Sequence, residues 1–301
     1  MKKKILIIGG TGFIGYHLAK ACLKLNWNVT SLSIKKPSKL RKLIKVKYFN
    51  CNIGKENQIK KLFKSNFNYV VNLGGYIDHF NKENTYKSHF IGVKNLANFF
   101  LKRNIESFIQ IGSSAEYGNI KSPHSENAKC NPKLIYGKSK LKATNYLLKL
   151  YKKKKFPVTI LRLYQIYGGG QNFDRFLPIL IKACIKDREF NASHGKQKRD
   201  FMHVNDVVEA IFKCFARKKS IGKIINLGSG KPMTLVNIMR KVQKIIGGGK
   251  ILLGKINLRI DEPMIIYPNL KNAKRLLGWK HKVIFKAGIK KTIKEYEKEL
   301  S

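Results

Sequence analysis

The fold is decided by one stretch near the start of the chain, Ile5-Leu6-Ile7-Ile8-Gly9-Gly10-Thr11-Gly12-Phe13-Ile14-Gly15. The four apolar residues predict a buried strand, and the glycines after them predict a tight turn into a helix. Gly9 permits the turn, Gly12 lets backbone amides approach an anion, and Gly15 lets the helix pack closely on the strand. This order is typical of a site that holds the pyrophosphate of a dinucleotide at a helix N-terminus, although a tight connection without a ligand is the alternative.

The chain continues with short apolar runs that alternate with stretches of helical period. Such alternation is typical of βαβ units and a parallel sheet. It predicts an α/β protein with a Rossmann-type doubly wound parallel sheet and a smaller mixed α/β substrate lobe. We expect strands at 4–8, 28–33, 69–73, 107–111, 158–163 and 224–227, and helices at 12–25, 55–64, 85–102 and 139–153.

The charge is the most unusual bulk property, because 62 Lys and Arg face 17 Asp and Glu, a formal net charge of +45. The lysines are spread along the whole chain instead of forming a basic patch, so we expect no specific nucleic acid and no membrane as partner. The five cysteines are scattered without a CxxC pair and the histidines show no ligand spacing, which predicts neither disulfides nor a metal site. The apolar run at the N-terminus stops at Gly9, too early for a signal or a membrane span, so we expect a soluble cytoplasmic protein.

The GxxGxxG spacing of Gly9, Gly12 and Gly15 resembles the extended short-chain dehydrogenase/reductases, whose members bind NAD or NADP. The second strand ends in Ser33, where a carboxylate would favour NAD. Because Lys35, Lys36 and Arg41 follow, NADP is the better electrostatic match, with NAD as the alternative. The resemblance implies the cofactor contacts Gly9, Thr11, Gly12, Phe13, Ile14, Gly15, Ser33, Lys35, Asn52, Ile53, Leu73, Gly74, Gly75, Tyr136 and Lys140.

The sequence contains four Tyr-x-x-x-Lys matches, which begin at Tyr117, Tyr136, Tyr151 and Tyr267. Context favours Tyr136 with Lys140, which lie one helical turn apart after Asn131-Pro132 and follow a strand that ends in Ser113-Ser114. The family places its catalytic hydroxyl there. We therefore expect Ser114, Tyr136 and Lys140 to be catalytic, with the cation of Lys140 moving the pKa of Tyr136 down from about 10.

The segment Ser114-Ala115-Glu116 separates subfamilies. In the sugar-nucleotide 4,6-dehydratases the corresponding pattern is Thr or Ser, then Asp, then Glu, and the two acids eliminate water. Here the Asp is missing, although Glu116 remains. The stretch is similar instead to 4-ketoreductases that act on deoxy-ketosugar nucleotides, such as GDP-4-keto-6-deoxymannose reductases and CDP-paratose and CDP-abequose synthases.

A second lobe carries the expected nucleotide-sugar contacts. The segment Arg199-Asp200-Phe201 resembles a family motif whose arginine contacts the substrate diphosphate, and Arg259 matches a second such arginine. The resemblance implies the substrate contacts Ser113, Ser114, Gln165, Arg175, Arg199 and Arg259. We assign residues 1–165 and 200–227 to the dinucleotide-binding domain and residues 166–199 and 228–301 to the nucleotide-sugar-binding lobe.

The expected activity is the NADPH-dependent reduction of the 4-keto group of a nucleotide-linked deoxysugar in surface-polysaccharide sugar biosynthesis. An NAD-dependent nucleotide-sugar 4-epimerase is the alternative, because it would use the same three catalytic side chains. The resemblance also implies a homodimer through the helices at 85–102 and 139–153, which carry the apolar residues Phe99, Phe100, Tyr146 and Leu150.

Overall fold

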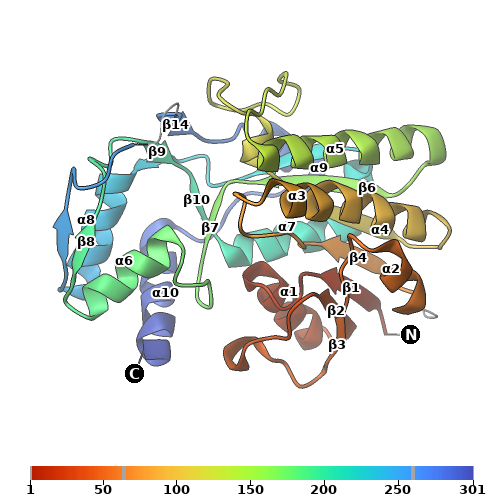
Figure 1. The fold of residues 1–301 in the computed structure, drawn as a ribbon, viewed down its shortest axis with the longest axis horizontal. Helices are drawn as coiled ribbons and strands as arrows, with labels where there is room; N and C mark the ends of the chain where they lie inside the picture. Colours follow the sequence, from red (N-terminus) through yellow and green to blue (C-terminus); the bar gives the residue numbers. More distant parts are fainter. Residues whose placement is uncertain (1, 63–65, 259–261, 301) are drawn as a thin grey trace.

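The computed structural model describes residues 2–62, 66–258 and 262–300, and a seven-stranded parallel sheet forms its centre (Figure 1). The strand order is β11-β6-β5-β4-β1-β2-β3. The strands are β1 (Lys4–Ile8), β2 (Asn28–Ser33), β3 (Val46–Asn50), β4 (Tyr69–Asn72), β5 (Ser107–Ser113), β6 (Val158–Leu163) and β11 (Ile224–Leu227). The predicted doubly wound fold is confirmed.

Helices cover both faces of this sheet, because its strands are apolar on both sides. One face packs against α1 (Phe13–Lys24), α7 (Val204–Ala216) and α9 (Lys271–Leu277). The other packs against α2 (Glu56–Leu62), α4 (Gly92–Leu101) and α5 (Ile135–Lys154). The strand order reverses between β1 and β4, and ligands of such sheets bind at the carboxyl ends of the strands beside that point.

The smaller lobe lies to the left of the sheet in Figure 1 and has its own apolar core. Its helices are α6 (Phe176–Ile185), α8 (Leu235–Ile246) and α10 (Phe285–Leu300). Short strands pair within it or beside it: β7 (Gln165–Tyr167) with β10 (Phe201–His203), β8 (Glu189–Asn191) with β13 (Lys250–Leu252), and β9 (Lys198–Arg199) between β12 (Met233–Thr234) and β14 (Ile265–Ile266). Ala273 and Trp279 pack on the large sheet, although they fall in the range assigned to the lobe, and the division of the chain remains a proposal.

Three elements differ from the sequence expectation. The edge strand β3 was not predicted, because only Val46 of its five residues is buried and the run carries no continuous apolar signal. The helix expected at 85–102 is interrupted: α3 (Lys82–Tyr86) passes through a π turn at Lys87–Ile91 into α4. Helix α5 begins at Ile135 instead of residue 139, and this places Tyr136 in its first turn. Within the described residues, no helix combines the length and the apolar character needed to cross a membrane.

Candidate active site

The loops after β1 and β4 meet at the reversal point of the sheet, where the dinucleotide cradle is predicted. Gly9 has a φ of 77°, in the region that favours glycine, and its amide donates to the Leu32 carbonyl over 2.7 Å. A side chain at Gly15 would collide with the Gly9 carbonyl. Gly12 is the N-cap of α1 and no side chain caps that helix, so its first-turn amides remain available to an anion. Thr11, Phe13 and Ile14 belong to this turn, and the residues present therefore fit a dinucleotide.

The other predicted cofactor residues surround this cradle. The Thr11 amide donates to Ser33 Oγ over 3.4 Å, which places the end of β2 beside the glycine loop. Asn52 Oδ1 accepts from the Gly54 amide, Ile53 is buried, and Lys35 is exposed. After β4, the Leu73 amide donates to the Ile8 carbonyl, and Asn72 Oδ1 accepts from the amide of Gly74, which precedes Gly75. The structure thus brings the loops after β1, β2 and β4 together, as expected.

The tyrosine and lysine predicted to be catalytic lie at the start of α5, against the end of β5. Lys140 Nζ donates to the Ile111 carbonyl over 2.8 Å and lies 5.9 Å from the centre of the Tyr136 ring. Tyr136 forms its hydrogen bond with Ser113, the last residue of β5. The structure thus brings Ser113, the last residue of β5, to Tyr136, whereas the expected Ser114 begins a 3-10 turn (Ser114–Glu116) and its catalytic role stays a prediction.

The protonation of this pair also differs from the expectation. Burial raises the pKa of Tyr136 above its usual value, against the opposing effects of the Ser113 hydrogen bond and the Arg175 charge. Burial lowers the pKa of Lys140 to about 8, although the Glu116 charge opposes this change. Both shifts have the same cause, because a low-dielectric environment disfavours the charged form of each group. At neutral pH Tyr136 is a phenol and Lys140 is mostly an ammonium group.

The other Tyr-x-x-x-Lys matches have different surroundings. Tyr117 is fully buried, and its hydroxyl donates to Asn226 Oδ1 over 2.8 Å. Tyr151 packs against Gly222, and the amide of Tyr267 donates to Ser122 Oγ. Of the four tyrosines, Tyr136 is the one that contacts Ser113 at the carboxyl end of β5.

Two histidines that sequence reasoning did not assign to this site enclose the tyrosine. The His79 ring stacks on Tyr136 with centroids 4.0 Å apart, and the buried His89 meets its edge at 4.9 Å. His89 Nε2 lies 3.1 Å from the Tyr76 carbonyl, and burial lowers the pKa of His89 to about 3. Burial and the Arg175 charge also lower the pKa of His79. The signal was weak, because two histidines ten residues apart form no recognised motif.

Glu116 is held in a buried ion pair. It accepts from the Ser113 amide at 2.9 Å, from Thr144 Oγ1 at 2.8 Å and from Arg162 Nε at 2.9 Å. Arg162 Nη2 lies 2.8 Å from the same carboxylate, and both side chains are at most 1% exposed. The guanidinium also covers the Tyr117 ring. Glu116 therefore stabilises the turn after β5, and its buried carboxylate is engaged by an arginine, a hydroxyl and a backbone amide.

The predicted substrate contacts are divided between several places. Ser113 and Arg175 lie near Tyr136, since the Arg175 charge affects the pKa values of both Tyr136 and His79. Gln165 is exposed on β7. Arg199 lies on β9 and pairs with Glu262 at 2.6 Å. Arg259 lies outside the described residues.

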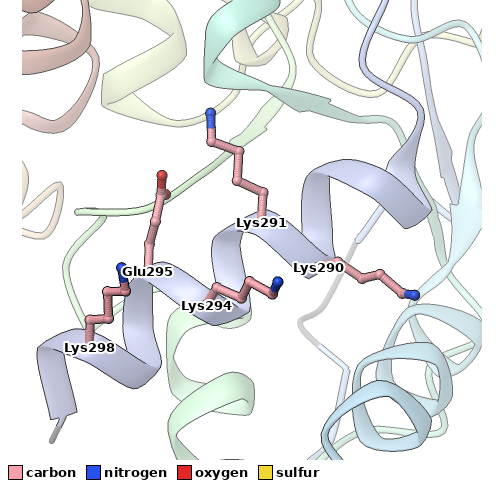
Figure 2. Close-up of a pocket in the computed structure, with 5 residues that line it drawn as sticks. All are labelled: Lys290, Lys291, Lys294, Glu295 and Lys298. Carbon is pink, nitrogen blue, oxygen red and sulfur yellow. The ribbon is translucent and has the colours of Figure 1, made fainter.

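A pocket on α10 is lined by none of the predicted site residues (Figure 2). It is lined by Lys290, Lys291, Lys294, Glu295 and Lys298, all from one helix, and Figure 2 shows their side chains spread along the helix without a common centre. We interpret it as part of the general basic surface. In the described ranges, no group of three or more His, Cys, Asp or Glu side chains is arranged to hold a metal ion.

Residues 5–228 match the model of the NAD dependent epimerase/dehydratase family. The chain belongs to this family. It is 26% identical to the dTDP-D-glucose 4,6-dehydratase of Homo sapiens, over 98% of this chain and 90% of that protein. It is 28% identical to the dTDP-4-dehydro-6-deoxyglucose reductase of Escherichia coli, over 97% of each. The structure of the Thermotoga maritima UDP-glucose 4-epimerase superimposes with a TM-score of 0.91 at 22% identity, over 99% of this chain and 100% of that one. The names of these relatives refer to three different reactions.

Proposed function

We propose that this enzyme reduces the 4-keto group of a nucleotide-linked deoxysugar with NADPH, as a cytoplasmic step of surface-polysaccharide sugar biosynthesis. The observation that carries the proposal is the state of Glu116. Its carboxylate is consumed by Arg162, Thr144 and the Ser113 amide, and Ser114 and Ala115 supply no second acid. Dehydration needs a positioned acid and base in addition to the tyrosine. This segment offers neither, and the Tyr136 hydroxyl is left as the proton donor.

The three catalytic side chains suit a reduction. Tyr136 donates its hydroxyl proton to the 4-oxygen of the sugar, and the Ser113 hydroxyl holds that oxygen in place. The raised pKa of Tyr136 keeps the phenol protonated before the reaction. The nearby Lys140 ammonium then stabilises the phenolate that remains. The bound cofactor would be held by the amides at Gly12, by the end of β2 at Ser33 and by Lys140. Its nicotinamide would supply the hydride to the 4-carbon.

The cofactor preference rests on the end of β2. Ser33 presents a hydroxyl where a carboxylate would repel the 2′-phosphate of NADP, and Lys35 is exposed two residues later. Arg41 argues less strongly for NADP than the sequence indicated, because its Nη2 donates to Asn172 Oδ1 over 2.8 Å. Because the hydrogen bond to Asn172 weakens the case for NADP, an NAD-dependent 4-epimerase is the second candidate.

The test uses the purified protein and four reactions. We expect NADPH to be consumed with dTDP-4-dehydro-6-deoxyglucose or GDP-4-keto-6-deoxymannose, and the Tyr136→Phe variant to consume none. Conversion of UDP-glucose to UDP-galactose, with tightly bound NAD in the protein as isolated, would establish the epimerase instead. Formation of a 4-keto sugar from dTDP-glucose would show that a dehydratase acid exists elsewhere and would refute the assignment.

We further propose a homodimer built on α4 and α5, which pack against each other and leave their outer faces partly open. Phe100 is buried in the core and does not belong to this face. Phe99, Tyr146 and Leu150 are half-buried and would form its apolar part.

A further inference from the structure

Arg199, the side chain proposed to bind the substrate diphosphate, already has an anionic partner. Its Nη2 donates to Glu262 Oε1 over 2.6 Å, and its Nη1 donates to the carbonyl of Lys198 over 2.9 Å. Both terminal nitrogens of the guanidinium are therefore engaged. A diphosphate oxygen that approaches the same group must share it with a carboxylate or replace that carboxylate.

The strand register explains why Glu262 lies beside Arg199. Arg199 belongs to the central strand of a small sheet, where β14 pairs with β9 in parallel and Ile266 lies opposite Arg199. The Lys198 amide also donates to the Met264 carbonyl over 2.7 Å, which holds the backbone next to Glu262 against β9. Only Pro263 separates Glu262 from this anchor, and the Glu262 side chain can rotate away while the backbone stays paired.

The pair is unequally buried. The Arg199 side chain is 8% exposed, whereas that of Glu262 is 24% exposed. The Arg162–Glu116 pair differs, because both of its members are enclosed. Rotation of Glu262 into solvent requires little rearrangement, whereas Arg199 cannot leave and would be a buried unpaired cation without an anion beside it. The geometry is that of an exchangeable counter-ion on a fixed guanidinium.

We propose that Glu262 is a displaceable latch on the diphosphate site: it neutralises Arg199 until the diphosphate of the nucleotide sugar replaces it. This inference rests on the proposed role of Arg199. A carboxylate and a diphosphate cannot both remain within hydrogen-bond distance of one guanidinium without strong repulsion. The exchange lowers the affinity for every anion at Arg199 by the same factor. Weakly held anions such as orthophosphate are thereby excluded at concentrations at which a nucleoside diphosphate still binds.

The experiment measures the dissociation constants of UDP and dTDP by calorimetry for the wild type, Glu262→Gln, Arg199→Ala and the double variant. We expect Glu262→Gln to bind both nucleotides about tenfold more tightly, because a charge-assisted hydrogen bond no longer has to be broken. Glu262→Asp should show a smaller gain. In the Arg199→Ala background the gain from Glu262→Gln should largely disappear.

Glu189→Gln is the matched control, since Glu189 pairs with Lys250 on the exposed surface of the same lobe and should leave both constants unchanged. Unaltered NADPH affinity in each variant shows that the fold is intact. Weaker or equal nucleotide binding by Glu262→Gln would overturn the latch. The same gain in affinity in the Arg199→Ala background as in the wild type would also overturn it, because it would show that Glu262 merely repels the nucleotide's negative charge. If Arg199→Ala binds UDP and dTDP as tightly as the wild type, the proposed diphosphate site itself is wrong.

Discussion

Replacing Glu116 by Gln should destabilise the protein strongly without changing the type of reaction. The substitution keeps the shape of the side chain but removes the charge that balances Arg162. It also turns an amide NH₂ group toward donors that in the wild type bond to a carboxylate oxygen. Those donors are the Ser113 amide, Thr144 Oγ1 and the Arg162 guanidinium, all within 2.9 Å. Breaking a buried ion pair by removal of one partner costs about 3–5 kcal/mol. We expect a loss of this size in the free energy of unfolding.

Thermal unfolding followed by circular dichroism measures the effect. At about 2 °C per kcal/mol for a chain of this size, the midpoint should fall by roughly 6–10 °C. Glu56→Gln is the control, because Glu56 pairs with Lys60 on the surface of α2 and such pairs contribute at most about 1 kcal/mol. An unchanged midpoint for Glu116→Gln would refute the structural role of the pair. A stable variant that has lost turnover would show that Glu116 takes part in the chemistry.

Four further predictions concern the site and the assembly. Tyr136→Phe should abolish turnover and leave NADPH affinity nearly unchanged, because the phenol acts on the substrate proton; turnover near the wild-type rate would exclude it as the donor. Lys140→Met should weaken both catalysis and cofactor binding. Burial lowers the pKa of Lys140 from 10.5 to about 8 in the folded state, so the stability of the variant relative to the wild type should be greatest below pH 8 and should fall as the pH rises from 8 to 10.5. Urea unfolding at several pH values measures this slope, and a pH-independent difference would contradict it. Arg199→Ala should weaken nucleotide-sugar binding by about tenfold to a hundredfold, with a deficit that persists in salt; a deficit that vanishes at high salt would assign Arg199 to the diffuse basic field. Light scattering should give the mass of a dimer once salt screens the charge of +45 on each chain, and a monomer mass at every ionic strength would contradict the proposed α4–α5 interface.

Much of the architecture could be predicted because it depends on local patterns. The glycine stretch after β1 and the spacing of apolar runs determine where strands begin and which side of the sheet binds a ligand. The edge strand β3 escaped prediction because an edge strand with four partly or fully exposed residues resembles a loop in sequence. The start of α5 escaped as well, since Leu134 at its N-cap has no capping side chain to mark the boundary.

The candidate site shows where motif reasoning ends. Tyr136 and Lys140 were selected from four matches by context, and the structure places them against the end of β5. The choice of Ser114 over Ser113 depends on the residue at which β5 ends. The sequence does not fix that residue, and a shift of one position exchanges the two serines. His79 and His89 approach Tyr136 only because the segment after β4 folds back over the start of α5, and their spacing alone predicts no such contact.

The amino-acid sequence by itself determined the sheet, the glycine cradle and the tyrosine–lysine pair, because each follows from residues close together in the chain. The tertiary structure alone decided which charges are neutralised. Glu116 meets Arg162 across 46 positions and Glu262 meets Arg199 across 63, so neither pairing has a local signature. The same packing partly buries Tyr136, buries Lys140 and shifts both pKa values toward the uncharged forms, since desolvation depends on every element that surrounds a group and not on its neighbours in sequence.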